Sequence, residues 1–151
     1  MIRTDTEYRR ALQRLKDEAD TLRAQQDHLA TLGLTDDEVV RAMDPMISFR
    51  AQLEEEVDAY DQMKRGDLGS LSSLSGIGRW LIGARIARRL SQAELAERLG
   101  VDPSQVSRDE RNDYRGVTVD RAQRIMEVLG LRFTAEAESL LEPDGATMAN
   151  A

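Results

Sequence analysis

The chain has 151 residues, of which 21 are Lys or Arg and 28 are Asp or Glu, giving a formal charge of −7. It has no cysteine and a single histidine, His28, which excludes a disulfide framework, a thiolate metal site and a histidine-based catalytic triad. No run of about eighteen apolar residues is present and the first residues lack the apolar core of a secretory signal, so we expect a soluble, cytoplasmic protein. We also expect that it has no cofactor.

Charge is distributed unevenly along the chain. Residues 1–69 contain ten basic and sixteen acidic side chains, whereas residues 76–132 contain eleven arginines, no lysine and eight acidic side chains. Arginine suits phosphate and guanine better than lysine, because its planar guanidinium donates two parallel hydrogen bonds. The basic second half is therefore where we expect a contact with nucleic acid.

The first 65 residues predict an antiparallel helical hairpin. Capping-box signatures begin the two helices at Thr4 and Thr35, and Gly33 ends the first. A chain reversal near residue 34 sets Tyr8 against Tyr60 at the open end of the hairpin. Apolar positions step by four and three as in a coiled-coil seam, along Tyr8, Leu12, Leu15, Ala19, Leu22, Gln26 and Leu29, and along Val39, Met43, Met46, Arg50, Leu53, Val57 and Tyr60.

Two features of the hairpin leave alternatives open. Pro45 predicts either a kinked second helix or a short helix over residues 36–43 followed by a new one, with Asp44 as its N-cap. Part of the remaining apolar surface is expected to meet a second copy or a different partner. That surplus consists of residues outside the two seams, namely Ile2, Ile47, Phe49 and Met63.

Residues 66–78 are rich in glycine and serine and predict a flexible linker to a second domain over residues 79–131. That domain begins with an amphipathic helix carrying Leu81, Ile82, Ile86 and Leu90 on its apolar face. Two short helices follow on either side of Gly100, over residues 92–99 and 103–111, and Thr118 caps a last helix over residues 119–129. The residues expected to face inward are Ala93, Leu95, Ala96, Leu99, Val106, Ala122, Ile125, Met126 and Leu129.

This second domain resembles the Cro/C1-type helix-turn-helix of phage repressors and many bacterial regulators, also called the XRE family. The resemblance runs from about residue 81 to 131. It implies an all-α chain, made of the hairpin and a four- to five-helix lambda-repressor-like domain, with a structural salt bridge between Arg85 and Glu110. Its specific residues are Arg85, the run Ser91-Gln92-Ala93-Glu94-Leu95-Ala96, Gly100-Val101, Ser104, Val106-Ser107-Arg108 and Glu110.

The chain departs from the family pattern at three positions. Pro103 stands where a polar, base-reading residue is common, and Asp109 stands where an apolar residue is usual. Arg89 stands where a glycine often ends the first helix. These departures put individual contacts in doubt more than the fold.

The resemblance implies that the helix over residues 103–111 enters the major groove of DNA. Gln105 is suited to adenine and Arg108 to guanine, because each can make a pair of hydrogen bonds to those bases, while Ser104 and Ser107 can serve bases or phosphate. The expected base-contacting residues are Ser104, Gln105, Ser107 and Arg108. The expected phosphate-contacting residues are Ser91, Gln92, Arg111, Asn112, Tyr114, Arg115 and Thr118.

The end of the chain supports two interpretations. Residues 132–141 include an alternation of apolar and polar side chains that indicates a short strand, but their Ala and Glu content favours a short helix. Residues 142–151 predict a disordered tail. Because a single domain of this size binds DNA weakly, we expect a homodimer on a palindromic operator, formed through the hairpin or the tail.

Three functions follow from these features. The first is a sequence-specific transcriptional regulator that acts as a bacterial or phage repressor. The opening residues also resemble the start of antitoxins from bacterial toxin–antitoxin operons, which implies autorepression and a toxin partner bound by the hairpin. The third is a protein-interaction scaffold with a degenerate helix-turn-helix. We expect no enzymatic activity, although composition leaves carboxylate-only magnesium chemistry open.

Overall fold

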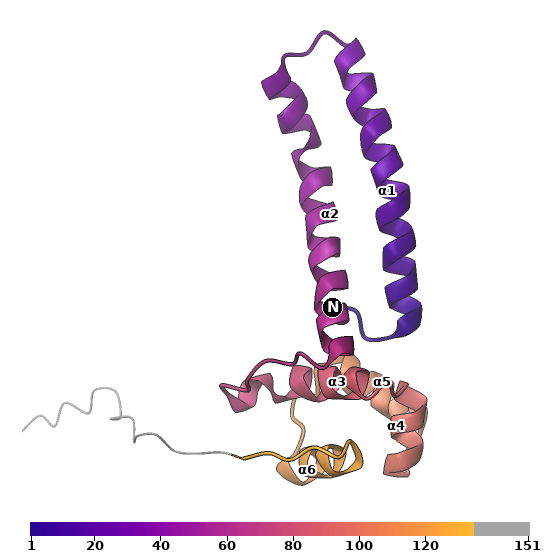
Figure 1. Ribbon diagram of the computed structural model, residues 1–151, viewed down its shortest axis with the longest axis vertical. Helices are drawn as coiled ribbons and strands as arrows, with labels where there is room; N and C mark the ends of the chain where they lie inside the picture. The colour runs from indigo at the N-terminus through magenta and orange to yellow at the C-terminus, as the bar shows by residue number, and fades with distance from the viewer. Residues whose placement is uncertain (135–151) are drawn as a thin grey trace, which may run out of the picture.

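The computed structural model describes residues 1–134, which form six α-helices and a short 3-10 helix without a β-strand (Figure 1). The expected all-α fold is therefore confirmed. Residues 131–134 have no regular structure, and the remainder of the segment expected to be a strand or helix, like the expected disordered tail, lies outside the described residues. The elements are α1 (Asp5–Thr31), α2 (Asp36–Arg65), η1 (Leu74–Gly76), α3 (Ile77–Ala87), α4 (Gln92–Leu99), α5 (Pro103–Arg111) and α6 (Val119–Val128).

Helices α1 and α2 form a long hairpin that stands on the cluster of shorter helices (Figure 1). At its base the rings of Tyr8 and Tyr60 stack with centroids 4.9 Å apart, as the seam pattern predicts. Farther along, Arg50 Nη1 donates to the carbonyl oxygen of Leu15 at 2.6 Å, so this polar seam residue joins the two helices. None of the helices within residues 1–134 is long and apolar enough to cross a bilayer.

The predicted seam of α1 is confirmed at Leu29, which is buried, and at Tyr8 and Leu15, which pack against the core, but it is wrong at Leu12 and Gln26. Ala11 is buried against α2, whereas Leu12 is 41% exposed and Gln26 is also exposed. A second correction concerns the apolar residues expected to be surplus. Ile2 is buried and Met63 packs against the core, while Ile47 and Phe49 stay exposed.

Helix α2 runs without interruption through Pro45. Proline has no backbone N–H, so the carbonyl of Arg41 loses its usual partner within the helix. Arg41 and Pro45 are both exposed, and water can satisfy that carbonyl in place of the missing donor. Of the two alternatives left open by the sequence, the structure shows the single helix.

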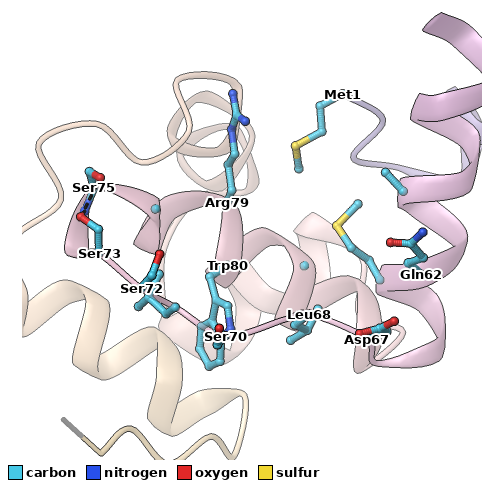
Figure 2. A pocket seen from close by; sticks show the side chains of 15 residues that line it. Met1, Gln62, Asp67, Leu68, Ser70, Ser72, Ser73, Ser75, Arg79 and Trp80 are labelled. Atoms are coloured by element: carbon cyan, nitrogen blue, oxygen red, sulfur yellow. Dashed lines mark hydrogen bonds between the residues drawn. The ribbon is translucent and has the colours of Figure 1, made fainter. Parts of the chain in front are cut away.

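The segment expected to be a flexible linker has structure of its own. It contains η1, and α3 already begins at Ile77. Leu68 packs against a core that joins hairpin residues such as Ile2 and Tyr60 to helices α3 to α6. A hollow of about 440 Å³ remains where the base of α2, this segment and α3 meet, and Figure 2 shows Met1, Gln62 and Trp80 around it.

The core of the short helices follows the predicted apolar positions with one exception. Leu95, Ala96, Val106 and Ile125 are completely buried, whereas Ala93 is exposed and not inward. Ala93 lies in the first turn of α4, and the neighbouring Gln92 is the residue of that turn that reaches helix α5. Tight helix packing therefore depends on Ala96, whose small side chain lies where α4 and α5 meet.

Gly78 in the first turn of α3 allows the backbone of the loop after α5 to come very close to this helix. A Cβ atom added to Gly78 would lie 1.8 Å from the carbonyl oxygen of Asp113, in the loop after α5. Asp113 and Tyr114 both have left-handed backbone conformations, with φ of 50° and 51°. The loop is therefore bent sharply against α3, and only glycine fits beneath it.

We predict that Gly78→Ala lowers the free energy of unfolding by about 2–3 kcal/mol, because the backbone of the loop must move away from the new methyl group. Thermal unfolding should show a fall in Tm of roughly 5–10 °C. The matched control is Gly83→Ala in the same helix, where the added atom would first meet the flexible end of Leu68, at 2.9 Å. Equal losses in the two variants would contradict the proposed backbone constraint.

Candidate nucleic-acid interface

Local signals fix the turn between α4 and α5. The hydroxyl of Ser91 accepts from the backbone N–H of Glu94 at 3.1 Å, and the Glu94 carboxylate accepts from the backbone N–H of Ser91 at 2.7 Å. The hydrogen bonds that the Glu94 carboxylate accepts from the backbone N–H and from the hydroxyl of Ser91 lower the pKa of Glu94. Gly100 ends α4 in the left-handed conformation, with φ of 69°. Asp102 then caps α5 by accepting from the backbone N–H of Ser104 at 2.8 Å.

Helix α5 has a buried face and an exposed face. Val106 and Glu110 are completely buried. Ser104, Arg108 and Arg111 are exposed and follow one another at steps of four and three, which places them along one stripe of the helix. Gln105 and Ser107 are half-buried at the edges of this stripe. The helix can thus present side chains to a partner without unpacking its core.

Arg85 on α3 and Glu110 on α5 form a buried, two-point ion pair. Nε donates to Oε1 at 2.6 Å and Nη2 donates to Oε2 at 2.7 Å. Arg85 also donates to the carbonyl oxygen of Leu90 at 2.7 Å and to that of Arg3 at 2.9 Å. One guanidinium therefore joins α5 to α3, to the turn before α4 and to the start of the chain.

Gln92, expected to contact phosphate, is occupied within the protein. Its Nε2 donates to Oε2 of Glu110 at 2.8 Å, so the carboxylate receives hydrogen bonds from both α3 and α4. The side chain of Gln92 is half-buried at the start of α4. The structure thus assigns its amide nitrogen to the support of α5.

A second network holds α5 from the side of α6. Arg121 Nη2 donates to Asp109 Oδ2 at 2.6 Å. With its amide oxygen turned toward Arg121, Gln105 accepts from Nη1 at 3.3 Å and from Nη2 at 3.2 Å. Sequence reasoning missed Arg121, although a carboxylate at the usually apolar position 109 was a signal that a cation should lie nearby.

The loop from α5 to α6 borders a hollow of about 280 Å³. Asn112 and Arg115 are exposed at its rim, and Thr118 caps α6 by accepting from the backbone N–H of Arg121 at 3.3 Å. Tyr114 corrects a prediction, because only 4% of it is exposed and its ring belongs to the core. Burial raises the pKa of the Tyr114 hydroxyl, and the side chain is not a free surface group for phosphate.

The first residues of the chain contact this same loop between α5 and α6. Arg3 Nη2 donates to Asp113 Oδ1 at 2.8 Å, and this hydrogen bond lowers the pKa of the Asp113 carboxyl. The amino terminus itself pairs with Glu56 Oε2 at 3.0 Å on α2. No periodic pattern predicts these contacts, since residues 1–3 precede the first helix. They connect the hairpin base to the end of α5.

The position of Arg89 agrees with the departure seen in the sequence. It follows α3 in the left-handed conformation, with φ of 57°, where the family often has glycine. A side chain in this conformation costs about 1 kcal/mol. The neighbouring Arg88 donates to the carbonyl oxygen of Gly130 at 3.0 Å, which fixes the turn after α3 to the end of α6.

We predict that Glu110→Ala lowers the free energy of unfolding by about 3–5 kcal/mol, because it leaves the Arg85 guanidinium buried without its counter-ion. Chemical denaturation measures this loss. Glu97→Ala on the exposed side of α4 is the control and should change stability by less than about 0.5 kcal/mol. The double variant Arg85→Met, Glu110→Leu should lose less than the two single changes together, and strict additivity would contradict a coupled pair.

Comparison with known proteins agrees with this geometry. The Helix-turn-helix family model matches residues 81–135, which begin within α3 and include α4, α5 and α6. No curated protein and no solved structure matches the chain. The hairpin of α1 and α2 lies outside the matched residues. The chain therefore contains, over residues 81–135, a helix-turn-helix domain of the Cro/C1 type, which is a DNA-binding domain of transcription regulators.

Proposed function

We propose that the protein is a sequence-specific transcriptional repressor whose two copies read a palindromic operator. The observation that carries this proposal is the support of helix α5, which is fixed on one side by Arg85 and on the other by Arg121. Such fixed side chains lose little freedom on binding, and rigid presentation favours specific recognition. A regulator of this kind acts on chromosomal DNA, in the cytoplasm of a bacterium.

Arg108 is the proposed reader of guanine. Its Nε donates to the carbonyl oxygen of Ser104 at 3.2 Å, one turn earlier in α5. This contact directs the side chain along the exposed stripe and leaves the two terminal nitrogens to donate to O6 and N7 of guanine. The hydroxyls of Ser104 and Ser107 lie beside it and serve neighbouring bases or phosphate.

Gln105 is proposed to read bases differently from the sequence-based expectation. Its amide oxygen accepts from Arg121, so the amide nitrogen is the group left to face the groove. A donor alone pairs with acceptors such as guanine O6, thymine O4 or a purine N7, and does not make the two-point contact with adenine. Gln105 therefore selects for an acceptor at its base position.

The phosphate contacts are proposed to flank α5 on both sides. On one side lies the exposed Ser91, at the start of α4; its own N–H and hydroxyl donate to the Glu94 carboxylate, so the next backbone N–H groups of this first turn are the donors proposed for an anion. On the other side lie Arg111 at the end of α5 and the rim of the 280 Å³ hollow, with Asn112, Arg115 and Thr118. These contacts set the position of the domain on the duplex, and the base contacts choose the site.

We predict that Arg108→Ala weakens binding to the preferred operator by about ten- to a hundredfold, since a two-point contact with guanine is lost. Fluorescence anisotropy on an operator selected from genomic fragments, against scrambled DNA, measures the change. The control is Arg41→Ala, which removes the same charge at the far end of the hairpin and should leave affinity unchanged. If both variants bind the operator as tightly as the unaltered chain does, Arg108 does not contact the operator bases and the proposal is wrong.

A second prediction concerns Arg121. Arg121→Ala frees the amide oxygen of Gln105 and leaves the Asp109 carboxylate without its cation, so affinity should fall and preference at one base should move toward adenine. Selection from a randomised operator library reads out the preference. Arg124→Ala, which removes an exposed arginine from the same helix, should keep the original preference. An unchanged preference in Arg121→Ala would count against the proposed orientation of Gln105.

The antitoxin function is a second candidate, favoured by the tip of the hairpin. Leu32 and Leu34 are 58% and 37% exposed in the connection between α1 and α2, far from the DNA-binding helices. Exposed leucines at such a site suit a protein partner. Co-expression with the product of the adjacent open reading frame tests this function. Toxicity that the full chain suppresses, and that Leu32→Glu with Leu34→Glu fails to suppress, would support it.

A further inference from the structure

We infer that one flank of the α1–α2 hairpin binds the same flank of a second copy, with both helix-turn-helix domains at the same end of the paired hairpins. This inference rests on the proposed function, in which two copies act on one operator. It adds the surface, the register and the relative direction of the two chains.

The hairpin offers an extended surface that the rest of the chain leaves uncovered. Its base packs against the short helices, and the remainder projects away from them (Figure 1). Four large apolar side chains within its helices are exposed: Leu12 at 41%, Val40 at 58% and Ile47 at 49%, and also Phe49 at 44%, whose ring lies on another side of α2 beneath the Arg14 guanidinium. Exposed apolar residues repeated along one helix favour contact with another helix.

Leu12, Val40 and Ile47 lie on one flank. Leu12 follows the buried Ala11 by one position, and Val40 follows the inward Val39 in the same way. A one-residue step turns a helix by about 100° in a fixed sense, so in two antiparallel helices it points to the same side of the pair. The flank so defined comprises Arg9, Leu12, Lys16, Ala19, Arg23, Gln26 and Ala30 of α1 and Val40, Asp44, Ile47, Ala51, Glu54 and Asp58 of α2.

Charge divides this flank into two halves. All the charged members on α1 are basic (Arg9, Lys16 and Arg23), and all those on α2 are acidic (Asp44, Glu54 and Asp58). Both sets follow the three- and four-residue steps of a coiled-coil surface, and ion pairs at such positions determine partner and orientation. A basic stripe beside an acidic stripe makes the flank complementary to a copy of itself.

The register of the hairpin brings these charges to matching heights. Counting from the Tyr8–Tyr60 stack, Arg9 lies level with Asp58 and Arg23 lies level with Asp44. Lys16 falls between Ala51 and Glu54. In a pair whose twofold axis runs along the hairpins, α1 of one copy lies beside α2 of the other at equal height. Each basic residue then meets an acidic residue of the second copy, three times in each of two identical seams.

The opposite arrangement is disfavoured by the same charges. If the two hairpins pointed in opposite directions with α1 against α1, the three basic residues of each copy would face one another, and like charges at such positions repel. In the favoured arrangement Ala19 falls between the heights of Ile47 and Ala51 of the second copy, about 3 Å from each along the axis, and the small side chain allows the helices to approach closely.

This direction has a consequence for DNA. Because both domains lie at the same end, the two α5 helices can reach the same side of one duplex, as half-sites about one helical turn apart require. Most of the dimer contact also stays away from α5, since the flank begins beside the base of the hairpin at Arg9 and Asp58 and continues along its projecting part.

Charge reversal tests the proposed surface. One full-length variant carries Arg9→Glu, Lys16→Glu and Arg23→Glu, and a second carries Asp44→Lys, Glu54→Lys and Asp58→Lys. Each alone should dimerise about a hundredfold more weakly than the unaltered chain in sedimentation equilibrium, through six repulsive contacts of modest size. An equimolar mixture should form a heterodimer, because both of its seams are again complementary. Circular dichroism checks that each variant keeps its helices.

Matched controls separate the flank from net charge. Arg10→Glu with Arg41→Glu changes charge in the same direction at exposed positions on other sides of the same helices, and should leave dimerisation intact. A stable dimer has a dissociation constant well below about 100 μM. An unaltered chain that stays monomeric at that concentration would therefore overturn the inference. Variants that dimerise as well as the unaltered chain would also overturn it.

Engineered cysteines test direction, since the chain has none of its own. An Ala19→Cys chain mixed with an Ile47→Cys chain should form a disulfide between the two, and Ala19→Cys alone should not. A disulfide in Ala19→Cys alone, with none in the mixture, would overturn the parallel arrangement.

Operator titration with Arg108→Ala keeps this inference distinct from the proposed function. A monomer that still binds its site through Arg108 would defeat only the inference about the hairpin. A dimer without sequence preference would defeat only the proposed function.

Discussion

The buried pair between Arg85 and Glu110 is the interaction on which the rest of the structure depends. Two charges removed from water are tolerated only when their hydrogen-bonding groups find partners, and here Glu110 receives Arg85 and Gln92 while Arg85 reaches two backbone carbonyls. Such a pair contributes less to net stability than to choosing one arrangement, because any shift of α5 leaves a charge without a partner. The exposed stripe of the recognition helix is therefore positioned from within the domain.

The same guanidinium connects the two parts of the chain. By donating to the carbonyl of Arg3 it joins the amino-terminal segment to the core of the helix-turn-helix domain, and the Arg3 side chain adds an ion pair with Asp113. Gly78 makes room for this loop. The hairpin is thus anchored where α5 ends, which joins the base of the hairpin directly to the helix-turn-helix domain.

Local patterns were enough to predict most of the architecture. The capping box at Thr4 and the turn at Gly100 are short-range signals, and the structure contains both of them. The burial of Ala11 in place of Leu12 could not be predicted, because positions 11 and 12 both fit the three- and four-residue steps of the seam between Tyr8 and Leu15. The contacts of Arg3, Arg121 and Gln92 join residues far apart in sequence, and no periodicity encodes them. The burial of Tyr114 depends on a loop with two successive left-handed residues, which composition does not reveal.

The anchored amino terminus also constrains the order of folding. The hairpin consists of contacts between neighbouring segments, which form early and can develop while the chain is still being synthesised. Arg3, however, pairs with a residue 110 positions later, so the joint at the base cannot close until almost all of the helix-turn-helix domain is available. Until then Ile2 and the lower face of the hairpin remain exposed to water. Residues 2 and 3, which are synthesised well before the helix-turn-helix domain, are thus among the last to reach their final positions.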